Sequence, residues 1–452
     1  MKFPLPSAFL FLGVFGLRSL CAAADSDNLT LPEDVMPQLR PVIEQAMRQA
    51  PRLLEKQLDV VQSQASGYML RASSLPSAGG FVQYQWQRET RADVGPQGDV
   101  SSTNDKFFYN FSVNQSVWQW GALEASRKIA RIERNLAQMN YSEAYRDLAA
   151  EIRANYLGLV LARLAVRNAE HVLRMAEENL KRQQARYNAN QLTYGQIMHE
   201  QLRVDDASLA LRRTRADFDF ALSSFRSLTG DAQFAESAIP ETIAEVPQGP
   251  ALANVVGTSA EESAAQLKIA EQEVEKAKLG LVGPSRNLWP KLGLIAGASR
   301  EEISRDLSLY NRYQIDTWYV GAQINWQVFD GLSTKGQKLE AYARLRRAEH
   351  RLANLKEALG RSLERERLEV GFSWEAYQNA KLRLRMAREG FDYTKDLFAR
   401  GEASQEQVDN SQGNVNANLH ATQSALAAHL NANVRFLSSQ GRDPLAKSPV
   451  QP

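Results

Sequence analysis

The stretch Gly80-Phe81-Val82-Gln83-Tyr84-Gln85-Trp86-Gln87 alternates between bulky apolar side chains and amides. On an extended chain Val82, Tyr84 and Trp86 point to one side, and the three glutamines point to the other. A period of two residues predicts a β-strand whose two faces meet different surroundings. The fold depends on what the apolar face of this strand contacts, because the amide face is suited to water.

Three further stretches repeat this alternation. Residues 106–114 follow the first stretch, and residues 292–298 and 318–327 form a second pair later in the chain. Each stretch has about ten residues, the length that a tilted strand needs to cross a bilayer. We expect the polar segments 89–105 and 300–316 to be the loops that join the members of each pair.

Two arrangements fit these strands. The apolar faces pack together in a small soluble sandwich, or they face lipid while the opposite faces line water. The second is favoured because the opposite faces are rich in amides, and it places Tyr84 and the tryptophans in or near the membrane interfaces. It predicts lipid-facing side chains at Val82, Tyr84, Trp86, Phe107, Tyr109, Phe111, Trp318, Val320, Ile324 and Trp326. The predicted lumen-facing side chains are Gln83, Gln85, Gln87, Asn110, Ser112, Asn114, Gln323, Asn325 and Gln327.

Four strands are too few to close a barrel. An open sheet edge inside lipid would leave backbone N–H and C=O groups without hydrogen bonds. The lipid-facing arrangement therefore requires that the chain share its barrel with copies of itself.

Long helices are predicted after each strand pair. No proline occurs at residues 97–239 or 291–443, and both intervals are rich in Ala, Leu, Arg, Glu and Gln, which favour helices. A helix from about Leu123 to Tyr187 would be roughly 100 Å long, which does not suit a compact globular domain. Coiled-coil packing is indicated by apolar residues one heptad apart, at Ile197, Val204, Leu211, Phe218 and Phe225.

The chain is an internal duplication. Val117-Trp118-Gln119-Trp120-Gly121 begins one helical block, and Val328-Phe329-Asp330-Gly331 begins another, 210 residues later. The first block breaks near Asn190, and the second breaks near Gly401. We predict a signal peptide at 1–24, lead helices at 25–78, a strand pair at 79–117 and a helix–turn–helix block at 118–236. The second half repeats this order with a linker and lead helix at 237–288, a strand pair at 289–328, a helical block at 329–441 and a tail at 442–452.

The first residues are typical of an export signal. Lys2 precedes an apolar run from Phe3 to Leu17, and small residues at Ala22-Ala23-Ala24 predict cleavage near Asp25. Loss of the two basic residues before this site changes the formal net charge from +2 to 0, a balance that gives no reason to expect nucleic acid as a partner. Cys21 is the single cysteine, and whether it carries a lipid is left open.

The order of these elements resembles the TolC-like outer membrane efflux family over essentially the whole mature chain. Gln327-Val328-Phe329-Asp330-Gly331 is similar to the family's P-L-F-D-G entry to the helices, with Gln327 in place of proline and Val328 in place of leucine. The lead segments Val42–Ala46 and Ala264–Lys278 are also similar to those of the family. Each motif is weak alone, but the repeated order is specific.

The resemblance implies a mainly α fold with a β-barrel part. Long coiled-coil helical hairpins would form an α-barrel tunnel, and four transmembrane strands per chain would complete a twelve-stranded barrel in a homotrimer. It also implies a location in the outer membrane of a Gram-negative-type cell, with the tunnel in the periplasm. The implied partners are a periplasmic adaptor (membrane fusion) protein and an inner-membrane transporter. The implied function is the exit duct of a tripartite efflux or type I secretion system.

The resemblance further implies that the two helical turns form a periplasmic gate and dock the adaptor. The residues assigned to this role are Tyr187, Asn190, Thr193, Gln196, His199, Gly401, Ser404, Gln407 and Asn410. Well-known members carry carboxylates six and nine residues after the turn glycine of the second half. Here those positions are Gln407 and Asn410, so we expect an end closed by amides and helix packing. Glu406 and Asp409 are adjacent, but neighbouring residues point about 100° apart on a helix, so they should face a neighbouring helix or solvent unless the register slips by one.

The sequence predicts no enzyme activity, no cofactor and no metal site. It contains no phosphate-binding glycine loop and no metal-ligand spacing, and its five histidines are scattered singly. The alternative function is a secreted soluble helical scaffold or adaptor protein that does not insert in a membrane. The sequence does not identify the exported solute or the class of pump.

Overall fold

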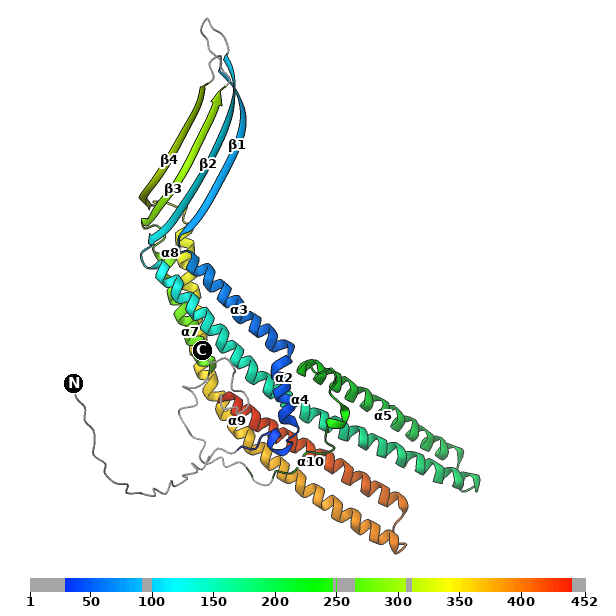
Figure 1. Ribbon diagram of the computed structural model, residues 1–452. Coiled ribbons are helices and arrows are strands. Elements are labelled where there is room, and N and C mark those ends of the chain that lie inside the picture. The colour runs from blue at the N-terminus through cyan, green and yellow to red at the C-terminus, as the bar shows by residue number, and fades with distance from the viewer. Residues whose placement is uncertain (1–28, 92–99, 247–248, 250–264, 306–310, 441–452) are drawn as a thin grey trace, which may run out of the picture.

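The computed structural model describes residues 29–91, 100–246, 249, 265–305 and 311–440. The predicted signal peptide and Cys21 lie outside these residues. Figure 1 shows an elongated molecule with a sheet at one end and long helices at the other. The elements are α1 (Pro32–Val35), α2 (Leu39–Gln49), α3 (Pro51–Ala72), β1 (Ser77–Arg91), β2 (Val100–Trp118), α4 (Ala122–Asn188), α5 (Tyr194–Thr229), η1 (Glu236–Ala238), α7 (Ala265–Gly280), α8 (Val282–Ser285), β3 (Lys291–Arg305), β4 (Asn311–Asn325), α9 (Ser333–Ala399) and α10 (Gln405–Ser439).

The two helical hairpins, α4/α5 and α9/α10, confirm the predicted duplication. Both α4 and α9 have 67 residues, and each begins, ends and turns 211 residues from its counterpart. Each of these helices is preceded by two residues with positive φ, Trp120 and Gly121 in the first half and Gly331 and Leu332 in the second. Gly121 therefore corresponds to Leu332, 211 residues later. The spacing of 210 residues between Gly121 and Gly331 does not relate equivalent positions.

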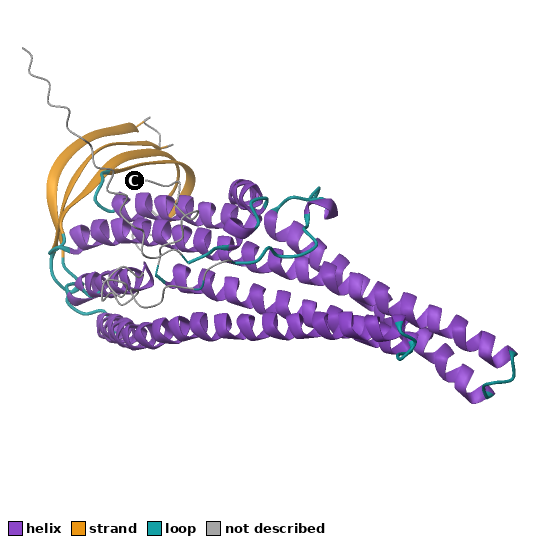
Figure 2. Cartoon of the chain, turned by 90° about the horizontal axis from the view of Figure 1, so that it is seen from below, coloured by secondary structure: helices purple, strands orange, loops and turns teal. Residues whose placement is uncertain are grey.

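The sheet is antiparallel in the order β1-β2-β3-β4, and Figure 2 shows that it is curved. Its strands have 15, 19, 15 and 15 residues, so the expected length of about ten is wrong. The segments expected to be loops are partly strand, because their polar side chains pair across strands. Arg300 contacts Asp316, and Thr90 Oγ1 lies 3.1 Å from Ser101 Oγ.

The core lies where the two hairpins meet. Leu148, Ile152 and Tyr156 of α4 are completely buried, and they pack with Ile43 of α2 and Phe225 of α5. Burial raises the pKa of the Tyr156 hydroxyl to about 12. The heptad positions of α5 are packed as predicted. Ile197, Phe218 and Phe225 are buried, and Val204 and Leu211 are half-buried. None of the helices within the described ranges combines the length and apolarity needed to cross a membrane.

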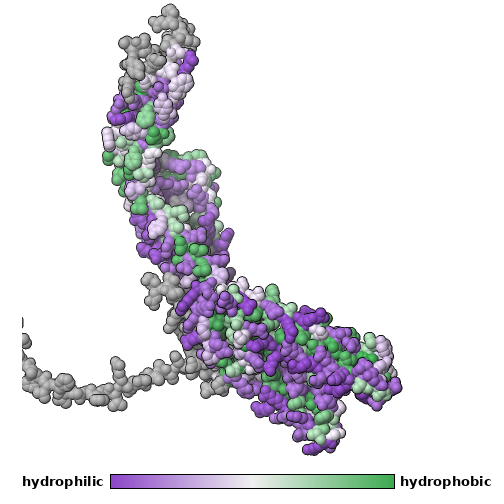
Figure 3. Space-filling model, turned by 45° about the vertical axis from the view of Figure 1, so that its right-hand side comes forward, coloured by the Kyte–Doolittle hydropathy of each residue, from purple (hydrophilic) through white to green (hydrophobic). Residues whose placement is uncertain are grey.

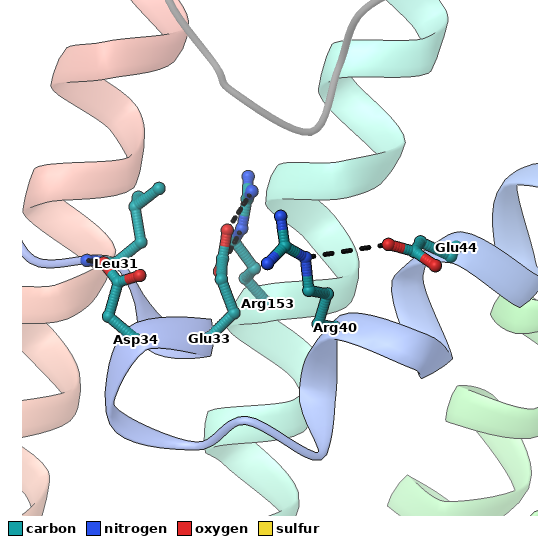
Figure 4. Close-up of polar contacts among 6 residues, drawn as sticks. All are labelled: Leu31, Glu33, Asp34, Arg40, Glu44 and Arg153. Atoms are coloured by element: carbon teal, nitrogen blue, oxygen red, sulfur yellow. Dashed lines mark hydrogen bonds and ion pairs between the residues drawn. The ribbon is translucent and has the colours of Figure 1, made fainter.

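Two segments outside the hairpins bind them together at this level. The linker after α5 contacts both hairpins, because the Ile243 backbone N–H donates to Gln423 Oε1 of α10 at 2.7 Å and the Tyr156 hydroxyl donates to the Ala238 carbonyl at 3.1 Å. The N-terminal segment contributes Glu33, which forms a buried ion pair with Arg153 of α4 at 2.6 Å (Figure 4).

Candidate functional site

The strand register gathers the predicted lipid-facing residues on one side of the sheet. In an antiparallel pair, directly opposed residues share a face. Val82 lies opposite Tyr109, Ala296 lies opposite Val320, and Ala298 lies opposite Trp318. The apolar face defined in this way holds nine of the ten predicted residues, and the tenth, Trp326, lies just after the end of β4.

The opposite, amide face carries the residues predicted to line the lumen. All of them lie on this face except Gln327, which follows β4. The amide face is less uniform than the sequence analysis expected. Phe81 and Phe108 form a tilted ring pair on it with centroids 6.1 Å apart. Tyr319 lies across Gly297, where an added Cβ would be 2.5 Å from the tyrosine hydroxyl.

Side chains of the apolar face are exposed in the single chain. Trp318 is 84% exposed and Val320 is 90% exposed. Figure 3 shows apolar residues gathered toward the end of the sheet next to the helices. The two outer strands, β1 and β4, each pair on one side only. One chain thus presents an uncovered apolar face and two unpaired sheet edges, which a soluble monomer would have to protect from association.

The apolar band runs obliquely across the strands. Tyr109 lies opposite Arg300, and Arg300 lies opposite Asp316, with which it forms two hydrogen bonds of 2.5 and 3.0 Å. The apolar residues of β3 and β4 therefore lie nearer the helices than those of β1 and β2. Strands of a barrel tilt by about 35–45° from the barrel axis. A band that crosses the strands obliquely can therefore run perpendicular to that axis, at one height around the barrel.

A tryptophan cluster joins the sheet to the helices. Trp120 lies edge-on to Trp289 with ring centroids 4.8 Å apart, and Trp118 lies 6.0 Å from Trp120. The Trp120 indole donates to the Pro290 carbonyl at 2.7 Å, and the Arg286 guanidinium is 5.9 Å from the Trp289 ring. In the sequence, Trp118 and Trp120 indicated only the start of a helical block. Their spacing of two at the end of an alternating strand was the available signal for an interfacial cluster.

The Asp-Gly pair of the family-like motif caps α9. Asp330 Oδ2 accepts hydrogen bonds from the Thr334 N–H at 2.8 Å and from the Thr334 hydroxyl at 2.5 Å. The hydrogen bonds from Thr334 hold the pKa of the Asp330 carboxyl below its usual value. Gly331 follows with φ of 64°, a conformation in which glycine costs least. This motif therefore fixes the direction in which the chain leaves the sheet.

The two helical turns have the same construction. Asn190 and Gly401 have φ of 57° and 78°, and each donates its N–H to a carbonyl three residues earlier at 2.9 Å. The next helix begins with a capping box in both turns. The Thr193 N–H donates to Gln196 Oε1 at 2.9 Å, and the Ser404 N–H donates to Gln407 Oε1 at 2.7 Å.

The residues assigned to the gate lie together at the two turns. All are exposed except Tyr187, which is half-buried: Asn190, Thr193, Gln196, His199, Gly401, Ser404, Gln407 and Asn410. The amide oxygens of Gln196 and Gln407 are used in the capping boxes. Both glutamines therefore stabilise the first turn of the helix that follows.

Asp409 faces a neighbouring helix, as its position on α10 predicted. Its carboxylate accepts from Arg182 of α4 at 2.7 Å. Among the described residues, this is the one direct ion pair between the α4/α5 and α9/α10 hairpins. The pair borders a groove of about 560 Å³ between α4, α5 and α10, which Asn410 also lines. Arg182 has no local signal in the sequence for this contact, because its partner is 227 residues away.

Within the described ranges, no group of three or more His, Cys, Asp and Glu side chains is placed to hold a metal ion.

Comparisons with known proteins give a family and a fold. Residues 42–231 match the family model described as "Outer membrane efflux protein". No curated protein shows significant similarity to the sequence. Among solved structures, the chain is similar to the CmeC outer membrane channel of Campylobacter jejuni, with 13% identity, coverage of 98% of this chain and 94% of that one, and a TM-score of 0.74.

Two further solved structures share this architecture. The VceC outer membrane protein of Vibrio cholerae is 14% identical, with 90% of this chain and 97% of that one covered and a TM-score of 0.68. The MtrE outer membrane channel of Neisseria gonorrhoeae is 14% identical, with 90% of each chain covered and a TM-score of 0.68. The family model thus covers residues 42–231, and the chain shares the fold of these outer membrane proteins over most of its length.

Proposed function

We propose that the chain is an outer-membrane channel-tunnel, the exit duct of a tripartite efflux or type I secretion system. The two-faced sheet carries this proposal. Its exposed apolar face suits lipid, its amide face suits water, and its two edge strands lack partners on their outer sides. In hydrocarbon those backbone groups need partners, so such a sheet is stable there only within a closed barrel.

The assembly is a homotrimer in this proposal. Four strands per chain make twelve in three copies, enough for a barrel with an open lumen. An exposed apolar stripe on α3 supports contacts with a neighbouring copy. Its members recur at heptad-like spacing on one side of the helix, at Leu54, Leu58, Val61 and Tyr68, and each is at least 50% exposed.

The helical turns form the closed end and the adaptor site. The Arg182–Asp409 ion pair and the packing of α10 on α4 hold the hairpins together there. The exposed turns at Asn190 and Gly401 meet the periplasmic adaptor protein, which connects them to the inner-membrane transporter. The tunnel lies in the periplasm, reached after cleavage of the predicted signal peptide.

Conductance in a planar lipid bilayer tests the channel. The purified full chain should insert and conduct ions, with current that rises when Asp409→Asn removes the link between the hairpins. The matched control is Asp59→Asn, because Asp59 pairs with Lys56 of the same helix and, among the described residues, does not link the two hairpins. The alternative function, a secreted soluble scaffold, predicts a soluble monomer that never conducts.

A further inference from the structure

Buried polar side chains meet where α9, α10 and the N-terminal segment come together. His429 and Asn433 of α10 are each 1% exposed, and Ser373 of α9 is 7% exposed. His429 Nδ1 lies 3.1 Å from Ser373 Oγ, and His429 Nε2 lies 3.4 Å from Asn433 Nδ2. Asn433 Nδ2 also donates to the Thr30 carbonyl at 3.0 Å. One side chain of α10 therefore holds the backbone of the N-terminal segment.

The fixed acceptors determine where the protons lie. The Thr30 carbonyl can only accept, so the NH₂ group of Asn433 faces it. The second N–H of that group then points at His429 Nε2, which must be an unprotonated acceptor. On the other side, the Ser373 hydroxyl donates to the Val370 carbonyl at 3.0 Å, so Nδ1–H of the ring is the donor to Ser373 Oγ. This arrangement requires neutral His429 with its proton on Nδ1.

We propose that His429 and Asn433 form a pH-sensitive clasp on the N-terminal segment. A proton added at His429 Nε2 would make this nitrogen a donor. It would then face the NH₂ group of Asn433, which is also a donor, and no hydrogen bond could form between them. Half a turn of the amide relieves this conflict, because Oδ1 then accepts from Nε2–H. The same turn places Oδ1 against the Thr30 carbonyl, and the hydrogen bond to Thr30 is lost. Asn433 can therefore donate hydrogen bonds to neutral His429 and to the Thr30 carbonyl, or it can accept one from protonated His429 and lose the bond to Thr30.

Turning the Asn433 amide also gives its side-chain oxygen a hydrogen bond, which offsets part of the free energy lost with the bond to Thr30. In the neutral arrangement, Asn433 Oδ1 is buried and has no hydrogen-bond partner in the described part of the chain. A buried acceptor without a partner costs about 1–3 kcal/mol. Bonding to protonated His429 would satisfy it, so the two orientations differ by less than the loss of the Thr30 contact alone.

Burial sets the direction of the pH dependence. It lowers the pKa of His429 below the ordinary 6.5, while a hydrogen bond to the Val370 carbonyl opposes part of the shift. The released form takes up a proton more readily, because Asn433 Oδ1 then accepts from Nε2–H. The clasp is therefore stable above pH 6.5 and weakens as the pH falls toward the lowered pKa.

Other titratable groups stand on the elements packed around His429. Glu33 pairs with Arg153, and Asp34 accepts from the Leu31 N–H. The remaining groups are Glu366, Glu369, Glu375 and Tyr377 on α9, Lys381 paired with Glu245 of the linker, and the exposed Arg435 on α10.

The clasped segment joins the two halves of the protein. Leu31 packs with Val434 and Leu437 of α10, and Glu33 reaches Arg153 of α4 (Figure 4). Release of Thr30 would remove one attachment of this segment to the second half while the Glu33–Arg153 pair keeps it on the first. The clasp thus couples pH to the joint between the hairpins, and it holds whether or not the chain conducts.

Amide hydrogen exchange in the full-length protein tests the clasp. Asp34 and Met36 donate backbone N–H groups within the segment, so their exchange reports its order. After correction for intrinsic rates, exchange in peptides covering residues 29–36 should be about tenfold faster at about pH 5.5 than at about pH 8, while exchange around Leu148 in the core stays constant. Equal protection at both values would overturn the proposal.

Two variants separate the clasp from other titrations. Glutamine cannot take up a proton but can both donate and accept, so His429→Gln should keep the segment protected at both pH values. Asn433→Asp removes the NH₂ group and should give fast exchange even at about pH 8. A pH response that persists in His429→Gln would assign it to another group, and full protection in Asn433→Asp would show that Thr30 is not held through this side chain.

Discussion

A positive charge at Val320 should impair membrane insertion. Val320 is 90% exposed on the apolar face, between Trp318 and Ile324. An arginine facing the middle of a bilayer costs about 2–4 kcal/mol, which lowers the insertion equilibrium of each chain by a factor of about 30 to 1,000. Gln323→Arg is the matched control, because Gln323 lies on β4 close by but on the amide face.

The assay is refolding of the purified variants into lipid vesicles, followed by flotation to separate inserted from soluble protein. Val320→Arg should remain largely soluble, and Gln323→Arg should insert as the unmodified protein does. Equal losses in both variants would mean that the two faces of the sheet have been assigned wrongly. Loss in Gln323→Arg alone would mean that they are reversed.

Three further predictions concern the turns and the core. Gly401→Trp should abolish export at normal trimer abundance, because nothing lies within 4 Å of a Cβ there and a side chain at a φ of 78° costs only about 1–2 kcal/mol; unchanged efflux would remove the docking role. Divalent cations added from the periplasmic side should change trimer conductance little, because amides are weak ligands for them. If divalent cations block the channel and Gln407→Ala abolishes this block while Asp409→Asn does not, the amides bind cations. If Asp409→Asn abolishes the block, the gate residues lie one position away from those assigned. Arg153→Met should lower the free energy of unfolding by about 3–5 kcal/mol by leaving Glu33 buried and unpaired. Arg40→Met, which breaks the exposed pair with Glu44 (Figure 4), should cost at most about 1 kcal/mol in the same denaturation experiment.

The sequence predicted the long helices closely, for a physical reason. A proline-free interval with heptad spacing leaves few alternatives to a coiled coil, and the expected helix from Leu123 to Tyr187 differs from α4 by one residue at each end. The strand faces were also predictable, because alternate side chains of a strand point to opposite sides, so that one residue's side fixes the side of all the others.

Contacts between distant segments were not predictable in this way. Arg300 and Asp316 have a loop-like composition, and only the register shows that they face each other across β3 and β4. Arg182 had no local signal for its contact with Asp409. His429 was one of five scattered histidines in the sequence, and its role depends on Ser373 and Thr30, which the fold brings to it from positions 56 and 399 residues earlier.

The oligomeric state of the protein extracted from cell membranes tests the central proposal most directly. The mature chain should sediment with the outer membrane fraction, and mild detergent should release a species with the mass of three chains. A soluble monomer recovered from the periplasm or the medium, with no membrane-bound trimer, would contradict it.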